Sequence, residues 1–163
     1  MGMQYDVKSV HSSASGVAVG YRTRLKGVLV SPSGSTTVNT AFCDNISVSG
    51  TYNVPGTTTC TVTIANHGLS NGDRVYLNFT SGSSTTPTDS PYTVSNVATN
   101  TFTVTVGSAT TNGNVTMYAV VLAEFDSSNA TSFYTLIPGE GILAEEGIYV
   151  GVPADVTTTL FYG

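Results

Sequence analysis

The feature that most constrains this chain is the lack of helical periodicity in its apolar residues. No segment places apolar residues on one helical face for more than a turn or two, whereas Thr, Gly and β-branched residues occur along the whole 163-residue sequence. These residue types favour strands and tight turns over helices. The sequence therefore predicts an all-β protein.

Strand-like segments at the two ends of the chain predict a β-sandwich or jelly-roll-like core. Strict alternation from Val17 to Leu25 predicts one long strand with a buried face, continuing through 27–30. Further strands of this core are expected, in chain order, at 37–42, 118–125, 132–137, 141–152 and 157–162.

The middle of the chain is richer in Thr, poorer in charge, and has short strands of its own. The clearest are at 58–65, 74–80, 92–97 and 100–106. Asn100, at the end of a short turn, is expected in the left-handed region. The sequence predicts an inserted small β-barrel or sandwich domain, 46–117, within a core formed by 1–45 and 118–163. Such an insertion is tolerated when the ends of the inserted domain lie close together.

The scarcity of charge bears on possible partners. Charged residues make up 9% of the sequence and the net charge is −5, whereas an average soluble domain has about 25% charged residues. A surface with so few charges predicts burial against partners, as a homo-oligomer or within a larger assembly. Phosphate binding needs a basic patch, so no nucleic-acid partner is expected. No apolar run is long enough for a membrane helix, so no membrane partner is expected either.

The first residues lack the basic and apolar regions of a signal peptide. This predicts a chain that is made and kept inside the producing cell. In that compartment Cys43 and Cys60 are expected to be free, partly buried thiols, although their separation in sequence is compatible with a disulfide.

Residues that could support catalysis or metal binding are sparse. His11 and His67 are far apart in sequence, have no nucleophile motif beside them, and His67 is expected at the surface of a turn. Glu145 and Glu146 form the one adjacent carboxylate pair in the sequence, but neighbours on a strand point to opposite faces and cannot share one substrate. The loop aspartates lack calcium-binding spacing. We predict no enzymatic activity, no cofactor and no metal site.

A basic stripe near the amino end is the strongest candidate for a binding site. Arg22, Arg24 and Lys26 alternate along the expected strand, so they would project from one face across about 13 Å. One interpretation is a solvated face that pairs with acidic residues of the same chain. These are Glu140, Glu145 and Glu146. The other is docking onto an acidic surface of a neighbouring subunit, where Arg makes directional contacts with carboxylates.

Two parts of the chain resemble proteins of tailed bacteriophages. The outer part, with RLKGVLV (24–30), LIPGEGIL (136–143), GIYV (147–150) and TLFYG (159–163), resembles small virion proteins of these phages, especially marine ones. The middle part, with HGLSNGDRVYL (67–77), YTV (92–94) and NTFTV (100–104), resembles a small β module present on many phage structural and tail proteins. The large insert is a departure, since similar small virion proteins often lack it.

The resemblance implies a non-enzymatic component of the virion, made in the host cytoplasm, whose partners are the major capsid protein or tail proteins. The first function it suggests is a capsid decoration or cement protein that stabilises the head as an oligomer, a trimer by analogy. The alternative is a tail-associated protein or host-surface adhesin, in which the Ser- and Thr-rich loop 81–91 meets a receptor or glycan. The number of copies per particle discriminates between the two.

Overall fold

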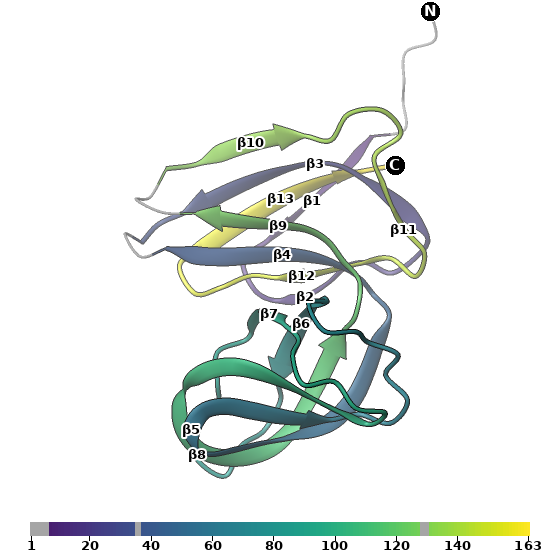
Figure 1. Ribbon diagram of the computed structural model, residues 1–163. Helices are drawn as coiled ribbons and strands as arrows, with labels where there is room; N and C mark the ends of the chain where they lie inside the picture. Colours follow the sequence, from purple (N-terminus) through teal and green to yellow (C-terminus); the bar gives the residue numbers. More distant parts are fainter. Residues whose placement is uncertain (1–6, 35–36, 128–130) are drawn as a thin grey trace, which may run out of the picture. The chain divides into compact units, whose positions relative to one another are not determined.

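The computed structural model describes residues 7–34, 37–127 and 131–163, and every regular element in these ranges is a strand (Figure 1). The predicted all-β class is confirmed. The strands, in chain order, are β1 (Lys8–Ser12), β2 (Gly16–Val19), β3 (Thr23–Pro32), β4 (Val38–Asp44), β5 (Ser47–Thr63), β6 (Arg74–Phe79), β7 (Ser90–Thr93), β8 (Thr101–Tyr118), β9 (Val121–Ser127), β10 (Phe133–Leu136), β11 (Ile142–Ala144), β12 (Ile148–Gly151) and β13 (Val156–Tyr162).

The chain divides into two compact units, and the second interrupts the sequence of the first. Unit 1 comprises 1–46 and 122–163, and unit 2 comprises 47–121. The domain predicted at 46–117 ends four residues before unit 2 does (121 − 117 = 4). Ser47 pairs with Tyr118 in the ladder between β5 and β8. The first and last strands of the sheet's long ladder, β5 and β8, therefore bring the chain's entry into unit 2 close to Tyr118, three residues before the unit ends.

Unit 1 is built from two antiparallel sheets. Sheet A has the strand order β1-β13-β3-β10, with β11 also paired to β3, and sheet B has the order β2-β12-β4-β9. Apolar side chains of both sheets form one buried core. Among its fully buried members are Leu25, Val28 and Val30 of β3, Phe42 of β4, Val150 of β12 and Leu160 of β13. This arrangement is consistent with a β-sandwich.

The long strand predicted from Val17 into 27–30 is wrong, because it is two strands in different sheets. β2 ends at Val19 in sheet B, the chain bends, and β3 begins at Thr23 in sheet A. The alternation of residue types continues across the bend, so the sequence pattern does not reveal that the chain bends there. Tyr21, expected on the buried face, is 52% exposed because it lies in the bend.

The strand predicted over 141–152 is broken in the same way. β11 pairs with β3 in sheet A, and β12 pairs with β2 and β4 in sheet B. Gly147, between them, has a φ of +106°. A Cβ atom at this position would lie 2.1 Å from the carbonyl oxygen of Val19. The two crossings between sheets therefore lie against one another, and glycine allows their backbones to meet.

The sheet of unit 2 closes on itself through β8. Its strand order is β5-β8-β6-β7. β8 pairs with β5 along most of its length, and its last residues, 115–118, also pair with β6. Just after β7, Ser95 pairs with Thr103 near the start of β8, so this segment lies beside β8. The barrel surrounds a second buried core, which includes Val62, Leu77 and Phe102.

Two local expectations for unit 2 need correction. β5 and β8 extend far beyond the predicted segments, because Pro55 and Gly56 are accommodated by irregular pairing near Pro55 and Thr57. Asn100 is not in the left-handed region, which is occupied instead by Asn66 and Asn96. The Asn100 side-chain oxygen accepts a hydrogen bond from the Asn66 backbone N–H at 3.0 Å.

Both cysteines are free and buried, Cys43 in unit 1 and Cys60 in unit 2. Burial raises the pKa of Cys60 to about 11. The pKa of Cys43 is raised more than that of Cys60. Burial is the main cause, followed by the negative charges of Glu124 and Asp44. We therefore expect neither thiol to react with an aromatic disulfide reagent at pH 8 in the folded protein, since the thiolate is the reactive form.

In denaturant the same reagent should label both thiols. Because each unit holds one cysteine, a Cys60→Ser variant reports the opening of unit 1, and a Cys43→Ser variant that of unit 2. Rapid labelling of the native protein would contradict the burial of the thiol concerned.

Candidate functional site

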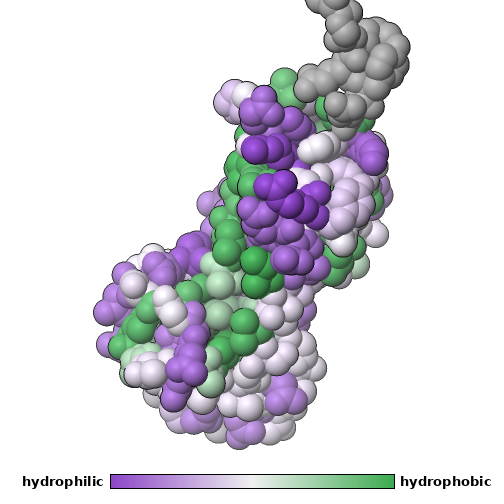
Figure 2. Space-filling model, turned by 90° about the vertical axis from the view of Figure 1, so that its right-hand side faces the viewer, coloured by the Kyte–Doolittle hydropathy of each residue, from purple (hydrophilic) through white to green (hydrophobic). Residues whose placement is uncertain are grey.

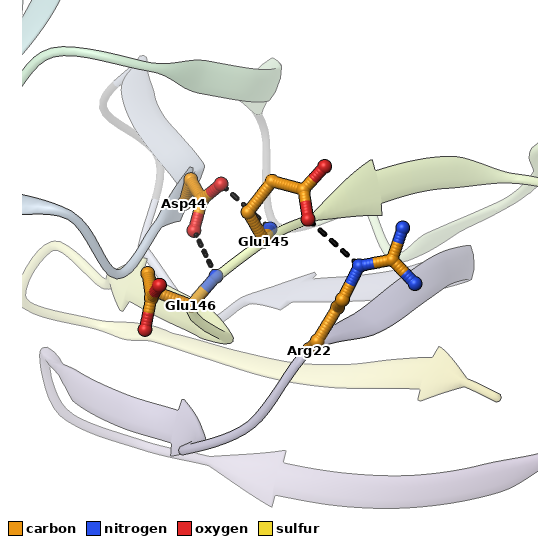
Figure 3. A network of polar contacts seen from close by, with 4 residues as sticks. All are labelled: Arg22, Asp44, Glu145 and Glu146. Atoms are coloured by element: carbon orange, nitrogen blue, oxygen red, sulfur yellow. Dashed lines mark hydrogen bonds and ion pairs between the residues drawn. The ribbon is translucent and has the colours of Figure 1, made fainter.

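The candidate site lies in unit 1, where the chain crosses between the two sheets. One crossing is the bend between β2 and β3, and the other is the turn between β11 and β12. The polar residues that meet there are Arg22, Asp44, Glu145 and Glu146, here called the crossing cluster (Figure 3). Three of these four were predicted as site residues from the sequence.

Asp44 holds the turn between β11 and β12 in place. It is the last residue of β4 and only 3% exposed. Its carboxylate accepts the backbone N–H of Glu145 at 2.7 Å and that of Glu146 at 2.9 Å. Hydrogen bonds to an ionised acceptor are stronger than those between neutral groups. Sequence reasoning missed this role, because the two backbone groups that Asp44 binds lie about a hundred residues away in sequence.

Arg22 forms an ion pair within the chain. Its Nε donates to Oε2 of Glu145 at 2.7 Å, and the two side chains are 64% and 55% exposed. The terminal nitrogens of Arg22 point away from Glu145 (Figure 3). Exposed pairs of this kind contribute about 0 to 1 kcal/mol to stability. Of the two interpretations of the basic stripe, pairing within the chain therefore applies to Arg22.

The predicted stripe does not form one strand face, which corrects its expected geometry. Arg22 lies in the bend, whereas Arg24 and Lys26 lie on β3 and are half-buried. Arg24 Nη1 donates to the carbonyl oxygen of Gly141 at 3.3 Å. The Lys26 side chain makes no ion pair or hydrogen bond with the described part of the chain.

The predicted acidic partners are distributed unevenly. Glu145 pairs with Arg22, whereas Glu146 joins the cluster through its backbone N–H and keeps an exposed side chain. Glu140 lies in the exposed turn next to Gly141, the residue whose carbonyl Arg24 contacts. Neither Glu140 nor Glu146 forms an ion pair within residues 7–34, 37–127 and 131–163.

The carboxylates of Asp44 and Glu145 bind other groups of the same chain and not one another. The carboxylate of Asp44 is directed to backbone N–H groups, and that of Glu145 is directed to Arg22. The described residues contain no group of three or more His, Cys, Asp or Glu side chains that could hold a metal ion. They also include no helix long and apolar enough to cross a membrane.

Two cavities lined by described residues lie in unit 2. One, of about 380 Å³, lies between residues 84–88 and 107–110 and is lined mainly by Ser and Thr. The other, of about 460 Å³, is lined by residues 66–69 and 97–99. His67, beside the second cavity, was expected at the surface but is half-buried. Its Nδ1 accepts the backbone N–H of Leu69 at 3.1 Å, and its ring packs edge-on against Phe102.

Comparisons with known proteins assign this chain to no family. No family model and no curated protein matches the sequence. Among solved structures, the chain is similar to the phage phi92 endosialidase, with 23% sequence identity and a TM-score of 0.33 over 82% of this chain and 20% of that one. The chain thus spans about a fifth of that protein's length. A likeness with so low a TM-score supports no inference about function.

Proposed function

We propose that this chain is a non-enzymatic structural protein of a bacteriophage particle, and within the particle a capsid decoration protein. The observation that carries the proposal is a charge-poor surface on which large apolar side chains are exposed. In unit 1 these include Val17, Tyr21, Tyr134 and Leu136. Figure 2 shows hydrophobic residues lying directly beside hydrophilic ones on the surface. Such surfaces are typical of proteins that are covered by partners.

The resemblance of segments 136–143 and 159–163 to small virion proteins supports the same proposal. The partner is then the major capsid protein, and self-association into a homo-oligomer is part of the proposal. Many copies bound to one shell would allow weak individual contacts to act together through their high effective concentration.

The number of copies per particle tests this function. Purified virions are separated on a denaturing gel, and the band of this protein is compared with that of the major capsid protein. A decoration protein should be present in numbers comparable with the capsid subunit. A few copies per particle would place it on the tail, and absence from the particle would overturn the structural role altogether.

The basic residues at the crossing are proposed to dock on an acidic surface of the capsid. Arg22 is held only by an exposed ion pair, and the ammonium group of Lys26 is available, so both can contact a partner. Replacing Arg22, Arg24 and Lys26 together with Gln should reduce occupancy of particles at least about tenfold, because breaking desolvated ion pairs at an interface is costly.

The control is a Lys8→Gln, Arg74→Gln double variant, which removes the two other basic residues of the chain. It should bind particles normally. If the triple variant also binds normally but melts earlier than the wild type, the basic residues serve internal pairing and the docking role is wrong.

A second candidate is a tail-associated adhesin that binds a neutral glycan, and the first cavity of unit 2 favours it. The residues lining this cavity include Ser84, Thr85, Thr86, Ser108 and Thr110, but none with a charge. Hydroxyl groups both donate and accept hydrogen bonds, as sugars do. Low copy number together with binding of the purified protein to host-surface glycan would favour this function over capsid decoration.

A further inference from the structure

β10 forms an open edge of sheet A, because it pairs with β3 on one side and with no strand of the described residues on the other. The backbone N–H of Ile137, the residue that follows β10, donates a hydrogen bond to the carbonyl oxygen of Lys26 in β3 at 2.9 Å. Successive residues of an antiparallel strand direct their backbone groups to opposite sides. The N–H and C=O groups of Thr135 therefore face β3, and those of Tyr134 and Leu136 face outward. Among the described residues, no backbone group bonds them there.

The other four edge strands of unit 1 have features that disfavour strand addition. β11, which pairs with β3 alone, is only three residues long, and very short edge strands offer little to pair with. β1 carries Lys8, and β9 carries Glu124 and Asp126. The pairing of β2 with β12 shifts register between Ile148 and Tyr149. Charges and irregular pairing are the usual means by which proteins protect sheet edges. β10 has neither, since its sequence is Phe-Tyr-Thr-Leu and its register with β3 is unbroken.

Apolar side chains extend this edge onto the outer face of sheet A. Tyr134 is 52% exposed and Leu136 is 66% exposed. Both lie close to Gly27, since a Cβ atom there would be 3.6 Å from Tyr134 Oη and 3.5 Å from Leu136 Cδ2. The ring of Tyr134 also stands edge-on to Phe161, with 5.6 Å between ring centroids. These three side chains, Tyr134, Leu136 and Phe161, are here called the β10 strip.

We infer that β10 is the self-association edge of this protein, where the β10 strand of a second copy adds antiparallel to it. The inference rests on the homo-oligomer included in the proposed function. A two-fold interface brings the same surface patch of both copies together, so that only residues on the axis face their own equivalents. A charged edge would therefore bring like charges together, whereas the uncharged β10 strip can meet itself without repulsion.

The outward backbone groups restrict the pairing, and in the register that we propose the two β10 strands overlap most fully. Tyr134 of one copy exchanges hydrogen bonds with Leu136 of the other, and Thr135 lies opposite its equivalent at the two-fold axis. The two copies of sheet A then form one continuous sheet, and their β10 strips adjoin. Because β10 is the one edge of this kind in the described part of unit 1, the product is a dimer rather than the trimer suggested by analogy.

The first test is the mass of the purified full chain in solution, by sedimentation or light scattering at tens of micromolar. The wild type should be a dimer. Leu136→Lys should weaken dimerisation at least about tenfold, because it puts like charges on both sides of the interface. Val17→Lys is the matched control, since Val17 is 55% exposed on the edge strand β2 of the other sheet. That variant should remain a dimer.

The second test is a cross-link at the proposed two-fold axis. Directly opposed residues that are not hydrogen-bonded in an antiparallel pair have Cα atoms about 4.5 Å apart, which suits a disulfide. Thr135→Cys should therefore form a covalent dimer on mild oxidation, while Ser9→Cys, on the opposite edge strand β1, should not. Cys43 and Cys60 are buried and do not compete.

The outcomes separate this inference from the function on which it rests. A monomeric wild type would overturn both the dimer and the homo-oligomer, while copy number would still decide the virion role. A wild-type dimer that persists in Leu136→Lys, or that fails to cross-link through Thr135→Cys, would overturn pairing at β10 alone. A monomeric wild type whose Leu136→Lys variant loses particle occupancy would show that β10 accepts a strand of another virion protein instead. Circular dichroism of each variant verifies that it is folded.

Discussion

Replacing Gly147 with Ala should destabilise unit 1 by about 3 kcal/mol or more, because two separate costs add. The φ of +106° at this residue is one that side-chain-bearing residues rarely adopt. A Cβ atom would also lie 2.1 Å from the carbonyl oxygen of Val19 and 2.9 Å from the backbone nitrogen of Tyr21. Both contacts are with backbone, so relief requires the bend between β2 and β3 to move.

Gly139→Ala provides the matched control. Its φ of +70° is also positive, but a Cβ atom there would have no neighbour within 4 Å. We expect this variant to lose about 1 to 2 kcal/mol, the cost of the left-handed conformation alone. Denaturant titration of both variants in a Cys60→Ser background, followed by labelling of Cys43, measures the opening of unit 1. Equal losses would show that the two crossings are not closely packed.

The second large effect is expected at Asp44. Asp44→Ala should destabilise unit 1 by about 2 to 4 kcal/mol, because it leaves the backbone N–H groups of Glu145 and Glu146 without their acceptor in a partly buried turn. Asp44→Asn should lose less, since the amide oxygen can still accept one of the two bonds.

Arg22→Gln is the control for Asp44→Ala. It breaks the exposed ion pair of the same cluster and should change stability by no more than about 1 kcal/mol. The same thiol-labelling titration serves for these variants. A loss at Arg22 as large as that at Asp44 would mean that the ion pair, rather than the buried carboxylate, holds the turn.

The strand content of this chain could be predicted, because apolar and polar residues alternate along a strand that has one buried and one exposed face. β4, β6, β10 and β13 lie close to their predicted positions. The break at 20–22 could not be predicted, because alternation continues through it and the bend depends on the other crossing. At 145–147 two adjacent glutamates and Gly147 do interrupt the apolar pattern, but the pattern does not show that the chain changes sheets there. The length of β5 was hidden for a different reason, since Pro55 and Gly56 are typical of turns and are tolerated here by irregular pairing.

The candidate site was predictable as a set of charges but not as a geometry. The sequence indicated that Arg22 and Glu145 could meet, and their ion pair is present. It could not place Arg22 outside the strand that holds Arg24 and Lys26, since that depends on the bend. The role of Asp44 depends on two backbone groups about a hundred residues away in sequence, and such partners leave no local pattern.

The interleaved topology also sets the order in which the protein can acquire structure during synthesis. In sheet A, β13 lies between β1 and β3, so Lys8 must wait for Tyr162 to be made before the two can pair. Unit 2 is one contiguous segment, and its strands are available as soon as Val121 has left the ribosome. The barrel can therefore fold while the earliest strands of the sandwich still lack their partners, and those strands remain open to unwanted pairing until β13 has been made.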